Sequence, residues 1–204
     1  MSGYLFAKSF LLGLAVAAPL GPVGALCIGR TLERGFWAGM AGGLGTALAD
    51  AAYALLAAFG FTVFAGLLAA IATPLALAGG LFLVWLGWKS LSPAPAGRTV
   101  LAGTEDLLRT MAATFLLTVA NPMTILSFAA IFAGLGLAGS ADGVSAVMVV
   151  AGVFLGSLAW WFLLSGAVAL IRRRLPDGFV LWVARISGLV IIGFGLVAIG
   201  SALV

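Results

Sequence analysis

The chain has 204 residues, of which 64% are hydrophobic and 8% are charged, and it contains no histidine. An ordinary soluble domain is only about half apolar, so the mean hydropathy of +1.27 excludes that class and indicates an integral membrane protein. The net charge of +4 does not indicate a nucleic-acid partner, because the cations fall in short gaps between apolar runs, where they report membrane orientation.

The N-terminal apolar run predicts the first membrane span, at about residues 4–29. Within this stretch Lys8 precedes an apolar run, and the small residues 15–17 form a pattern that also occurs at signal-peptide cleavage sites. The run before that site is short, and the apolar pattern continues well beyond it. The single cysteine, Cys27, lies inside the span, which excludes an intrachain disulfide and a thiolate metal cluster.

The middle of this first span carries the sequence Pro19-Leu20-Gly21-Pro22-Val23-Gly24. Its prolines and glycines remove helix hydrogen bonds at about the depth where a bilayer holds no water to replace them. Proline also suits the first turn of a new half-helix, whose positive N-terminal end attracts a carboxylate. We expect Pro19, Gly21 and Pro22 to line a solute pathway, with a simple kink as the alternative.

Residues 35–91 carry only two charges, Asp50 and Lys89. A single helix over this stretch would be roughly 85 Å long at 1.5 Å per residue, which is about twice the length of one crossing. We therefore expect two helices, at about 36–59 and 68–91, joined by a tight turn.

Asp50 lies near the middle of the second predicted span and is the only charge placed deep in any span. An ionised carboxylate costs about 2.5–3.5 kcal/mol there on insertion scales. On a helix, Thr46 and Tyr53 share its face. We expect Asp50 to bind an amino group or to carry the coupling proton, with Thr46 and Tyr53 beside it; an aspartate that only links helices is the alternative.

Residues 92–109 contain prolines, glycines and charged residues and predict the one substantial polar loop. Three further apolar runs follow it and are each near the length that a bilayer needs. We place these spans at about 110–137, 144–171 and 179–203.

The dipeptide Asn121-Pro122 interrupts the fourth span much as the earlier motif interrupts the first. Each break should free carbonyls one turn earlier, near Ala18 and Thr118. Asn121 adds a donor and an acceptor. Freed carbonyls and a positive helix end together fit a zwitterion, so we expect Asn121 and Pro122 to belong to the pathway.

The cations fall in or beside the first, third and fifth connections: Arg30, Arg34, Lys89, Arg98, Arg109, Arg172, Arg173, Arg174 and Arg185. The second and fourth connections carry none, so the positive-inside rule predicts cytoplasmic odd connections and places both termini outside. Lys8 departs from this pattern.

The two halves of the chain share three matched features: Gly21-Pro22-Val23 with Asn121-Pro122-Met123, Leu44-Gly45-Thr46 with Leu155-Gly156-Ser157, and Gly80 and Gly87 with Gly188 and Gly195. Three helices per repeat is an odd number, so the halves must cross in opposite directions, as in many secondary transporters. We predict one all-α transmembrane domain over 1–204, with about six helices in two inverted repeats, at about 1–91 and 110–204, and with proline-broken first and fourth helices.

Trp161 occupies the place of Asp50 in the second repeat and forms a mid-span pair with Trp160. An indole there can form an apolar or cation–π wall of the site. We include Trp161 among the pathway residues, with packing against lipid as the alternative.

A pattern of motifs covers nearly the whole chain: residues 19–24 followed by Leu26-Cys27-Ile28 and Arg30-Thr31-Leu32; then Gly35, Gly39, Gly43-Leu44-Gly45 and Ala49-Asp50; then Ala120-Asn121-Pro122-Met123-Thr124, Ser127-Phe128 and Phe132-Ala133-Gly134. In this pattern the chain resembles the lysine exporter (LysE-type) translocators, which include the homoserine and threonine exporters. The resemblance implies a six-helix inner-membrane protein that exports amino acids or related small solutes on an ion gradient.

By position, the motif residues expected around the pathway are Pro19, Gly21, Pro22, Asp50, Asn121 and Pro122. Leu20 is inserted into the Pro-Gly-Pro motif that is commonest in the amino-acid exporters, which leaves the substrate open. Distant relatives in the resembled family move metal ions, so an inorganic or metal ion remains the alternative cargo. A single carboxylate deep in the membrane, however, supplies few of the oxygen ligands that a divalent cation needs.

Enzyme classes fit the chain poorly, so we expect no catalytic residues and no cofactor. The absence of histidine excludes Ser-His-Asp sites, and the sequence has no Walker-type loop for ATP. Transport must then run on a proton or sodium gradient, or as a facilitated leak. The expected partners are a small solute, a coupling ion and the bilayer, and the Gly-rich faces allow a homodimer. A membrane scaffold that uses these faces to bind partner helices is the non-transport alternative.

Overall fold

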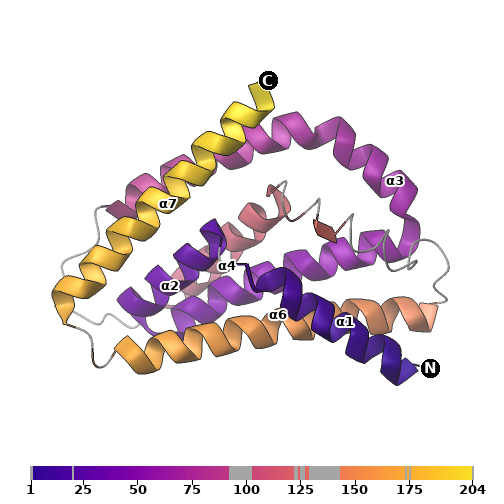
Figure 1. Ribbon diagram of the computed structural model, residues 1–204, viewed down its shortest axis with the longest axis horizontal. Coiled ribbons are helices and arrows are strands. Elements are labelled where there is room, and N and C mark those ends of the chain that lie inside the picture. Colours follow the sequence, from indigo (N-terminus) through magenta and orange to yellow (C-terminus); the bar gives the residue numbers. More distant parts are fainter. Residues whose placement is uncertain are drawn as a thin grey trace.

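The computed structural model describes residues 2–19, 21–91, 103–121, 124, 127–128, 143–172, 174 and 176–203. Within these ranges the chain is helical and contains no strand, which confirms the all-α prediction. Figure 1 shows the helices α1 (Ser2–Ala17), α2 (Pro22–Arg34), α3 (Phe36–Leu91), α4 (Thr104–Val119), α6 (Gly143–Arg172) and α7 (Asp177–Leu203).

Three segments in the described part of the chain are long and apolar enough to cross a membrane: Phe36–Ala58, Gly143–Arg172 and Arg185–Leu203. Helices α1 and α2 add a fourth span if this pair, bent by 80°, is one broken crossing. The predicted total of six spans stays a prediction.

Helix α3 differs from the expectation of two helices and a tight turn, because it is continuous over 56 residues. Figure 1 shows that its ribbon bends back, so that a first limb (Phe36–Ala58) and a second limb (Ala76–Lys89) run in opposite directions. The sequence between the limbs holds no Asn, Asp or Gly-Pro pair that would favour a tight turn. The predicted tight turn is therefore wrong, while the reversal of direction that it was meant to explain is present.

The second limb of α3 packs along α7 through glycines on both helices. A Cβ atom built on Gly80 would lie 2.8 Å from the carbonyl oxygen of Gly195, and one on Gly87 would lie 2.6 Å from that of Gly188. Such distances leave no room for any side chain. The two backbones therefore touch directly, as small residues permit in membrane helices.

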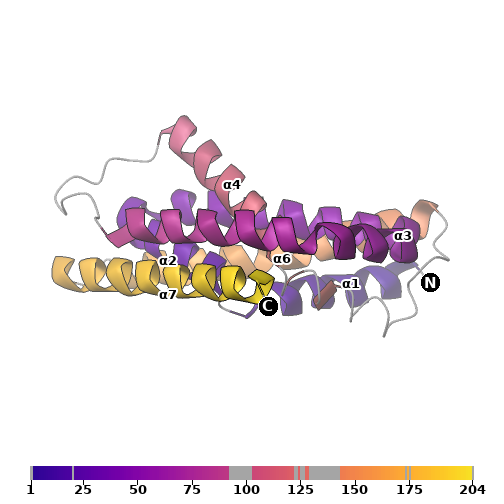
Figure 2. The same cartoon turned by 90° about the horizontal axis from the view of Figure 1, so that it is seen from above.

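Two more close helix pairs are α1 with α6 and the first limb of α3 with α4. A Cβ on Gly156 would lie 2.0 Å from the carbonyl oxygen of Phe10, and one on Gly45 would lie 2.1 Å from that of Met111. These glycines are the middle residues of the two matched triplets in the sequence. In Figure 2, α4 is inclined to the other helices.

Polar contacts join three helix ends on one side of the molecule. Arg34 at the end of α2 pairs with Asp106 at the start of α4, Nη1 to Oδ2 at 2.9 Å. At the end of α6, Arg172 donates from Nη2 to the carbonyl oxygen of Glu33 at 3.1 Å. The N-terminus lies at the far end of the molecule from these contacts (Figure 1).

A first apolar cluster in the interior contains Ala17, Val23, Leu26, Cys27, Leu83, Leu86, Leu117, Trp161 and Ile191. A second contains Tyr53, Ala54, Ala57, Phe128, Val149 and Val153. The first joins residues on either side of the α1–α2 break to α6 and to the last turn of α4. The second cluster joins the face of α3 that follows Asp50 in the chain to α6.

Candidate functional site

The first break forms as the sequence predicts. Helix α1 ends at Ala17, and α2 begins with Pro22 as its first residue. Gly21 precedes it with extended backbone angles, φ −93° and ψ −157°. Pro22 thus starts a new half-helix, because its fixed φ suits a first turn and its missing N–H is not needed there.

The N-terminal end of α2 is a buried helix start without a side-chain cap. Its first backbone bond runs from the N–H of Ala25 to the carbonyl oxygen of Gly21, at 3.0 Å. The N–H groups of Val23 and Gly24 precede that bond and have no partner within the helix. A helix end of this kind favours a negatively charged group. Pro22 is buried beside it, whereas Pro19 is exposed.

The second break begins where α4 ends, at Val119. The N–H of Asn121 donates to the carbonyl oxygen of Thr118 at 3.2 Å. The expectation that the carbonyl group of Thr118 is freed is therefore wrong. The chain turns there, and the backbone N–H of Asn121 donates to that carbonyl oxygen. The expectation for Ala18 stays a prediction, and Pro122 lies outside the described residues.

Asp50 is buried in the first limb of α3, with 1% of its surface exposed. Its Oδ2 accepts a hydrogen bond of 2.7 Å from Oγ of Ser157 on α6, which is fully buried. Among the buried side chains in the described part of the chain, Asp50 is the only one of a charged type. A hydrogen bond to a carboxylate is stronger than one between neutral groups, so this contact joins α3 and α6.

Ser157 was not among the residues predicted for the site. Its position in the repeat matches that of Thr46, and this was the signal that could have found it. Thr46 itself was predicted to stand beside Asp50. It is buried, but its Oγ1 donates to the carbonyl oxygen of Gly42 in its own helix, at 3.3 Å.

Tyr53 connects the face of α3 that carries Asp50 to the second break. Its hydroxyl donates to the carbonyl oxygen of Val119 at 2.6 Å. Its ring stacks on Phe128, with centroids 5.5 Å apart. The last carbonyls of a helix lack partners within it, so Tyr53 covers the open end of α4.

Trp161 lies one turn after Ser157 on α6 and is 2% exposed, so it is buried and does not pack against lipid. A Cβ on Gly43 would lie 2.3 Å from Cβ of Trp161, which makes a glycine necessary on the facing helix. Trp161 belongs to the first apolar cluster together with Ala17 and Val23, which flank the first break. Its buried Nε1 has no hydrogen-bond partner among the residues that the structure describes.

The predicted site residues thus fall into three groups. Asp50, Tyr53 and Trp161 lie at the crossing of α3 and α6. Of these, Tyr53 contacts the end of α4 at the second break, and Trp161 belongs to the apolar cluster at the first break. Pro22 and Gly21 shape the first break. Of the remaining four, Pro19 is exposed, Thr46 bonds within its own helix, Asn121 is half-buried at the end of α4, and Pro122 lies outside the described residues.

Comparison with known proteins decides the family. A family model for the LysE type translocators matches residues 14–201. The chain belongs to the LysE type translocator family. The resemblance noted in the sequence is thereby confirmed, and the protein is a membrane translocator.

Three relatives cover most of this LysE-type chain. The "Putative amino acid efflux protein YcgF" of Bacillus subtilis is 29% identical over 94% of the chain and 93% of the relative. The "Chemotactic transduction protein ChpE" of Pseudomonas aeruginosa is 30% identical over 83% and 85%. The "Uncharacterized membrane protein YahN" of Escherichia coli is 31% identical over 81% and 76%. No solved structure matches the chain.

Proposed function

We propose that this LysE-type protein is a secondary transporter that exports amino acids or similar small solutes across the cytoplasmic membrane by proton or sodium antiport. The observation that carries the proposal is the buried pair of Asp50 and Ser157 at the crossing of α3 and α6. An amino-acid cargo is also the one that the name of the Bacillus subtilis relative indicates for that protein.

The proposed pathway residues are Pro19, Gly21, Pro22, Thr46, Asp50, Tyr53, Asn121, Pro122 and Trp161. The carboxylate of Asp50 suits the ammonium group of an amino acid. The uncapped start of α2 suits its carboxylate. Trp161 supports this arrangement, because it contacts the cluster at the first break and lies one turn from the serine that holds Asp50.

The position of Asp50 supports the proposal of antiport. A carboxylate buried among apolar helices is costly unless a cation accompanies it. When the ammonium group of the substrate leaves toward the outside, a proton or a sodium ion must take its place at Asp50 before the site can face the cytoplasm again. The carrier then exchanges one cation for another, and an ion gradient can drive export.

We propose that the two halves form inverted repeats, and the glycine contacts support this. The repeat equates Gly80 with Gly188 and Gly87 with Gly195. A twofold operation that exchanges the halves would turn a contact of Gly80 with Gly195 into one of Gly188 with Gly87. Both contacts are present.

A second set of contacts supports the same twofold relation. In the first half, α3 approaches α4 through Gly45, at Met111 and Thr114. In the second half, α6 approaches α1 through Gly156, at Phe10 and Leu14. Alternating access in such folds moves one repeat or bundle against the other around a fixed site.

We further propose that the odd connections face the cytoplasm and that both termini lie outside. The ion pair of Arg34 with Asp106 and the bond from Arg172 to Glu33 support this orientation, since they gather cationic helix ends on one side of the molecule. Positive residues collect on the cytoplasmic side of membrane proteins.

Proteoliposomes loaded with a panel of labelled amino acids would test the proposal. We expect at least one amino acid to leave faster when a proton or sodium gradient is imposed, and D50N to abolish that acceleration. E105Q is the matched control, because Glu105 is an exposed acid on α4 that pairs with Arg109 on the helix surface. Efflux that is unchanged in D50N would contradict the proposed site, and transport of metal ions alone would indicate the alternative cargo.

A further inference from the structure

Three glycines lead toward Asp50 from the side of the molecule where the ends of α2 and α6 meet the start of α4. Gly35, Gly39 and Gly43 follow one another at intervals of four residues. Asp50 comes fifteen residues after Gly35, which is about 22 Å along a helix. Side chains of α2 and α6 lie against these glycines. We call this contact of the first limb of α3 with α2 and α6 the seam.

The middle of the seam is closed by two hydroxyl groups from different helices. A Cβ atom on Gly39 would overlap Oγ1 of Thr31 on α2 and would lie 2.9 Å from Oγ of Ser165 on α6. Thr31 and Ser165 are both fully buried. One turn closer to Asp50, Trp161 fills the space at Gly43. The seam thus leaves no open way to Asp50.

The outer end of the seam is held by two polar ties. The guanidinium of Arg172 donates to the carbonyl oxygen of Glu33 and lies beside Gly35, where a Cβ atom would be 3.6 Å from its Nη1. The ion pair of Arg34 with Asp106 joins the same end of α2 to α4. Elsewhere α2 contacts α4 only sparsely. These two ties therefore hold the end of α2 against the second half of the chain.

Buried polar atoms without a hydrogen-bond partner are concentrated at the seam. Among the residues that the structure describes there are four such side-chain atoms, in Ser9, Trp160, Trp161 and Ser165. Three of the four lie within six consecutive residues of α6. Unpartnered buried groups are rare and cost stability. A surface that separates and meets water or a polar solute in another conformation explains why they are kept here.

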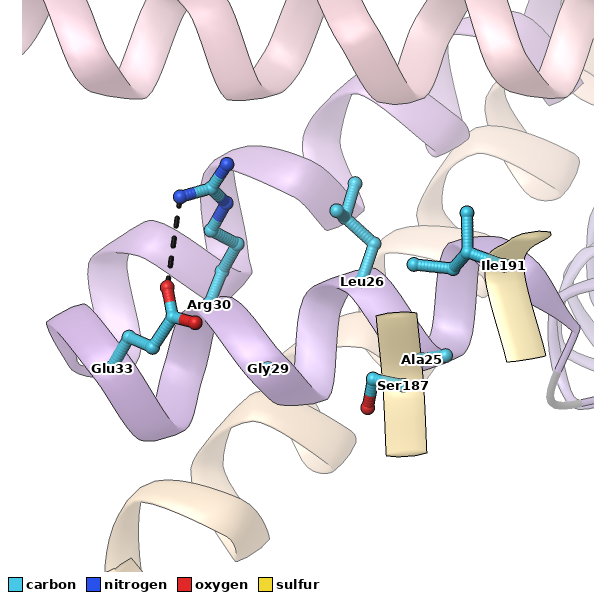
Figure 3. A pocket seen from close by; sticks show the side chains of 7 residues that line it. All are labelled: Ala25, Leu26, Gly29, Arg30, Glu33, Ser187 and Ile191. Atoms are coloured by element: carbon cyan, nitrogen blue, oxygen red, sulfur yellow. Dashed lines mark ion pairs between the residues drawn. The ribbon is translucent and has the colours of Figure 1, made fainter. Parts of the chain in front are cut away.

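The opposite face of α2 borders a small pocket between α2 and α7 (Figure 3). Arg30 and Glu33 line it as an ion pair, with Nη1 and Oε2 3.7 Å apart, together with Ser187 and Ile191 of α7. The pocket has room for about one water molecule and is continuous with open solvent. The last turns of α2 therefore separate a wetted surface from the dry seam.

We propose that the seam is the cytoplasmic gate of the transporter. The end of α2 moves away from α3 and α6, and the amino acid passes Thr31, Ser165 and Trp161 to reach Asp50. The described structure is the closed gate, so these side chains meet the solute only when the seam opens. The hydroxyl of Ser165 and the indole N–H of Trp161 then donate to water or to the carboxylate of the solute. The inference rests on the proposed function for its solute and its orientation.

Loosening the two ties should favour the open gate. Inverted membrane vesicles expose the cytoplasmic face and right-side-out vesicles expose the other face, so the KM of the exported amino acid is measured from each side. The apparent affinity on one side follows the population of the state that is open to it. A looser gate therefore lowers the cytoplasmic KM and raises the external KM. A general loss of stability would not move the two values in opposite directions.

We expect R172Q to shift the two KM values about tenfold, because a charge-assisted hydrogen bond is lost. R34Q should shift them about threefold, because a partly exposed ion pair contributes less. The double variant R34D/D106R should return the values toward those of the wild type. R109Q and E105Q are matched controls, since they neutralise an exposed ion pair within α4. Unchanged values in both R172Q and R34Q would overturn the inference.

A covalent bond across the seam should stop export. The hydroxyl oxygens of Thr31 and Ser165 both lie within 3 Å of the Cβ position of Gly39, so the sulfur atoms of T31C/S165C would be neighbours. The pair is made together with C27A, which leaves only the two designed thiols. Oxidation with copper phenanthroline should abolish export and dithiothreitol should restore it, while mass spectrometry verifies the disulfide. The reduced protein is its own control.

The outcomes separate this inference from the proposed function. If the wild type exports an amino acid and the oxidised pair exports it equally fast, the gate is wrong and the transporter proposal stands. A pair that cannot be oxidised contradicts the described seam and also overturns the inference. If the wild type exports no amino acid, the transporter proposal fails and the inference falls with it. If the reduced pair is itself inactive, the KM values of R172Q and R34Q decide.

Discussion

Two of the close helix crossings of α3, with α7 and with α6, both depend on glycines but differ in what they enclose. Where the second limb crosses α7, Gly80 and Gly87 touch the backbone of α7 directly. Where the first limb crosses α6, Gly43 admits Trp161, and a carboxyl group is enclosed beside it. Small residues bring both pairs of helices together. From this contrast we infer that close packing alone does not mark the proposed site, whereas an enclosed charge does.

The largest effect should come from removing the charge at the α6 crossing. We expect D50N to lower exchange in proteoliposomes by about 100-fold or more, since an amide can neither neutralise an ammonium nor carry a proton. The thermal stability in detergent should change little, because the amide oxygen can still accept from Ser157. Substantial exchange in D50N would remove the distinction between the two crossings.

The next effect should come from widening the α7 crossing. G87L should destabilise the protein by about 3 kcal/mol, or prevent its folding, because the new side chain meets backbone that cannot move aside. G193L on α7 is the control, since a Cβ there meets nothing within 4 Å. Thermal unfolding followed by gel filtration measures both. Equal stability of the two variants would contradict the described crossing.

A smaller effect is expected from removing the partner of Asp50. S157A should lower the exchange rate about tenfold, because hydrogen bonds to charged groups contribute roughly 1.5–3 kcal/mol. S145A, at a half-buried position near the start of the same helix, should leave exchange unchanged. A full rate in S157A would mean that the serine is packing only and does not orient the carboxyl group.

The smallest effect should come from a polar contact between α3 and α4 outside both crossings. Thr114 donates from Oγ1 to the carbonyl oxygen of Gly42 at 2.7 Å. T114V keeps the shape and should cost about 0.6 kcal/mol, the average for hydrogen bonds between membrane helices. Thermal unfolding and exchange are measured together. A loss of exchange without a loss of stability would extend the functional region to α4.

The sequence predicted features that depend on local chemistry. Pro22 begins a helix because proline suits a first turn, and Asp50 is buried because its whole segment is apolar. Both conclusions need only a few neighbouring residues. The helical class followed in the same way, whereas the family followed from the resemblance of motifs along nearly the whole chain.

The remaining features depend on contacts between distant segments. Ser157 lies 107 residues from Asp50, and Ser187 and Ile191 reach the pocket at Arg30 only through the packing of α7 on α2. The continuous course of α3 depends on how the limbs pack against other helices. Residue types and spacing within a segment do not specify such pairings, which is why the pocket and the partner of Asp50 were missed.

Cys27 gives this protein a built-in chemical reporter. It is the single cysteine of the chain, it is 1% exposed, and a Cβ on Gly42 would lie 2.8 Å from its Sγ. A maleimide can reach that sulfur only when the packing around it opens, and the contact of α2 with α3 at Gly42 is part of that packing. The rate at which a maleimide labels the unaltered protein, with and without substrate, therefore reports how fast the packing around Cys27 opens. No cysteine has to be introduced or removed for this measurement.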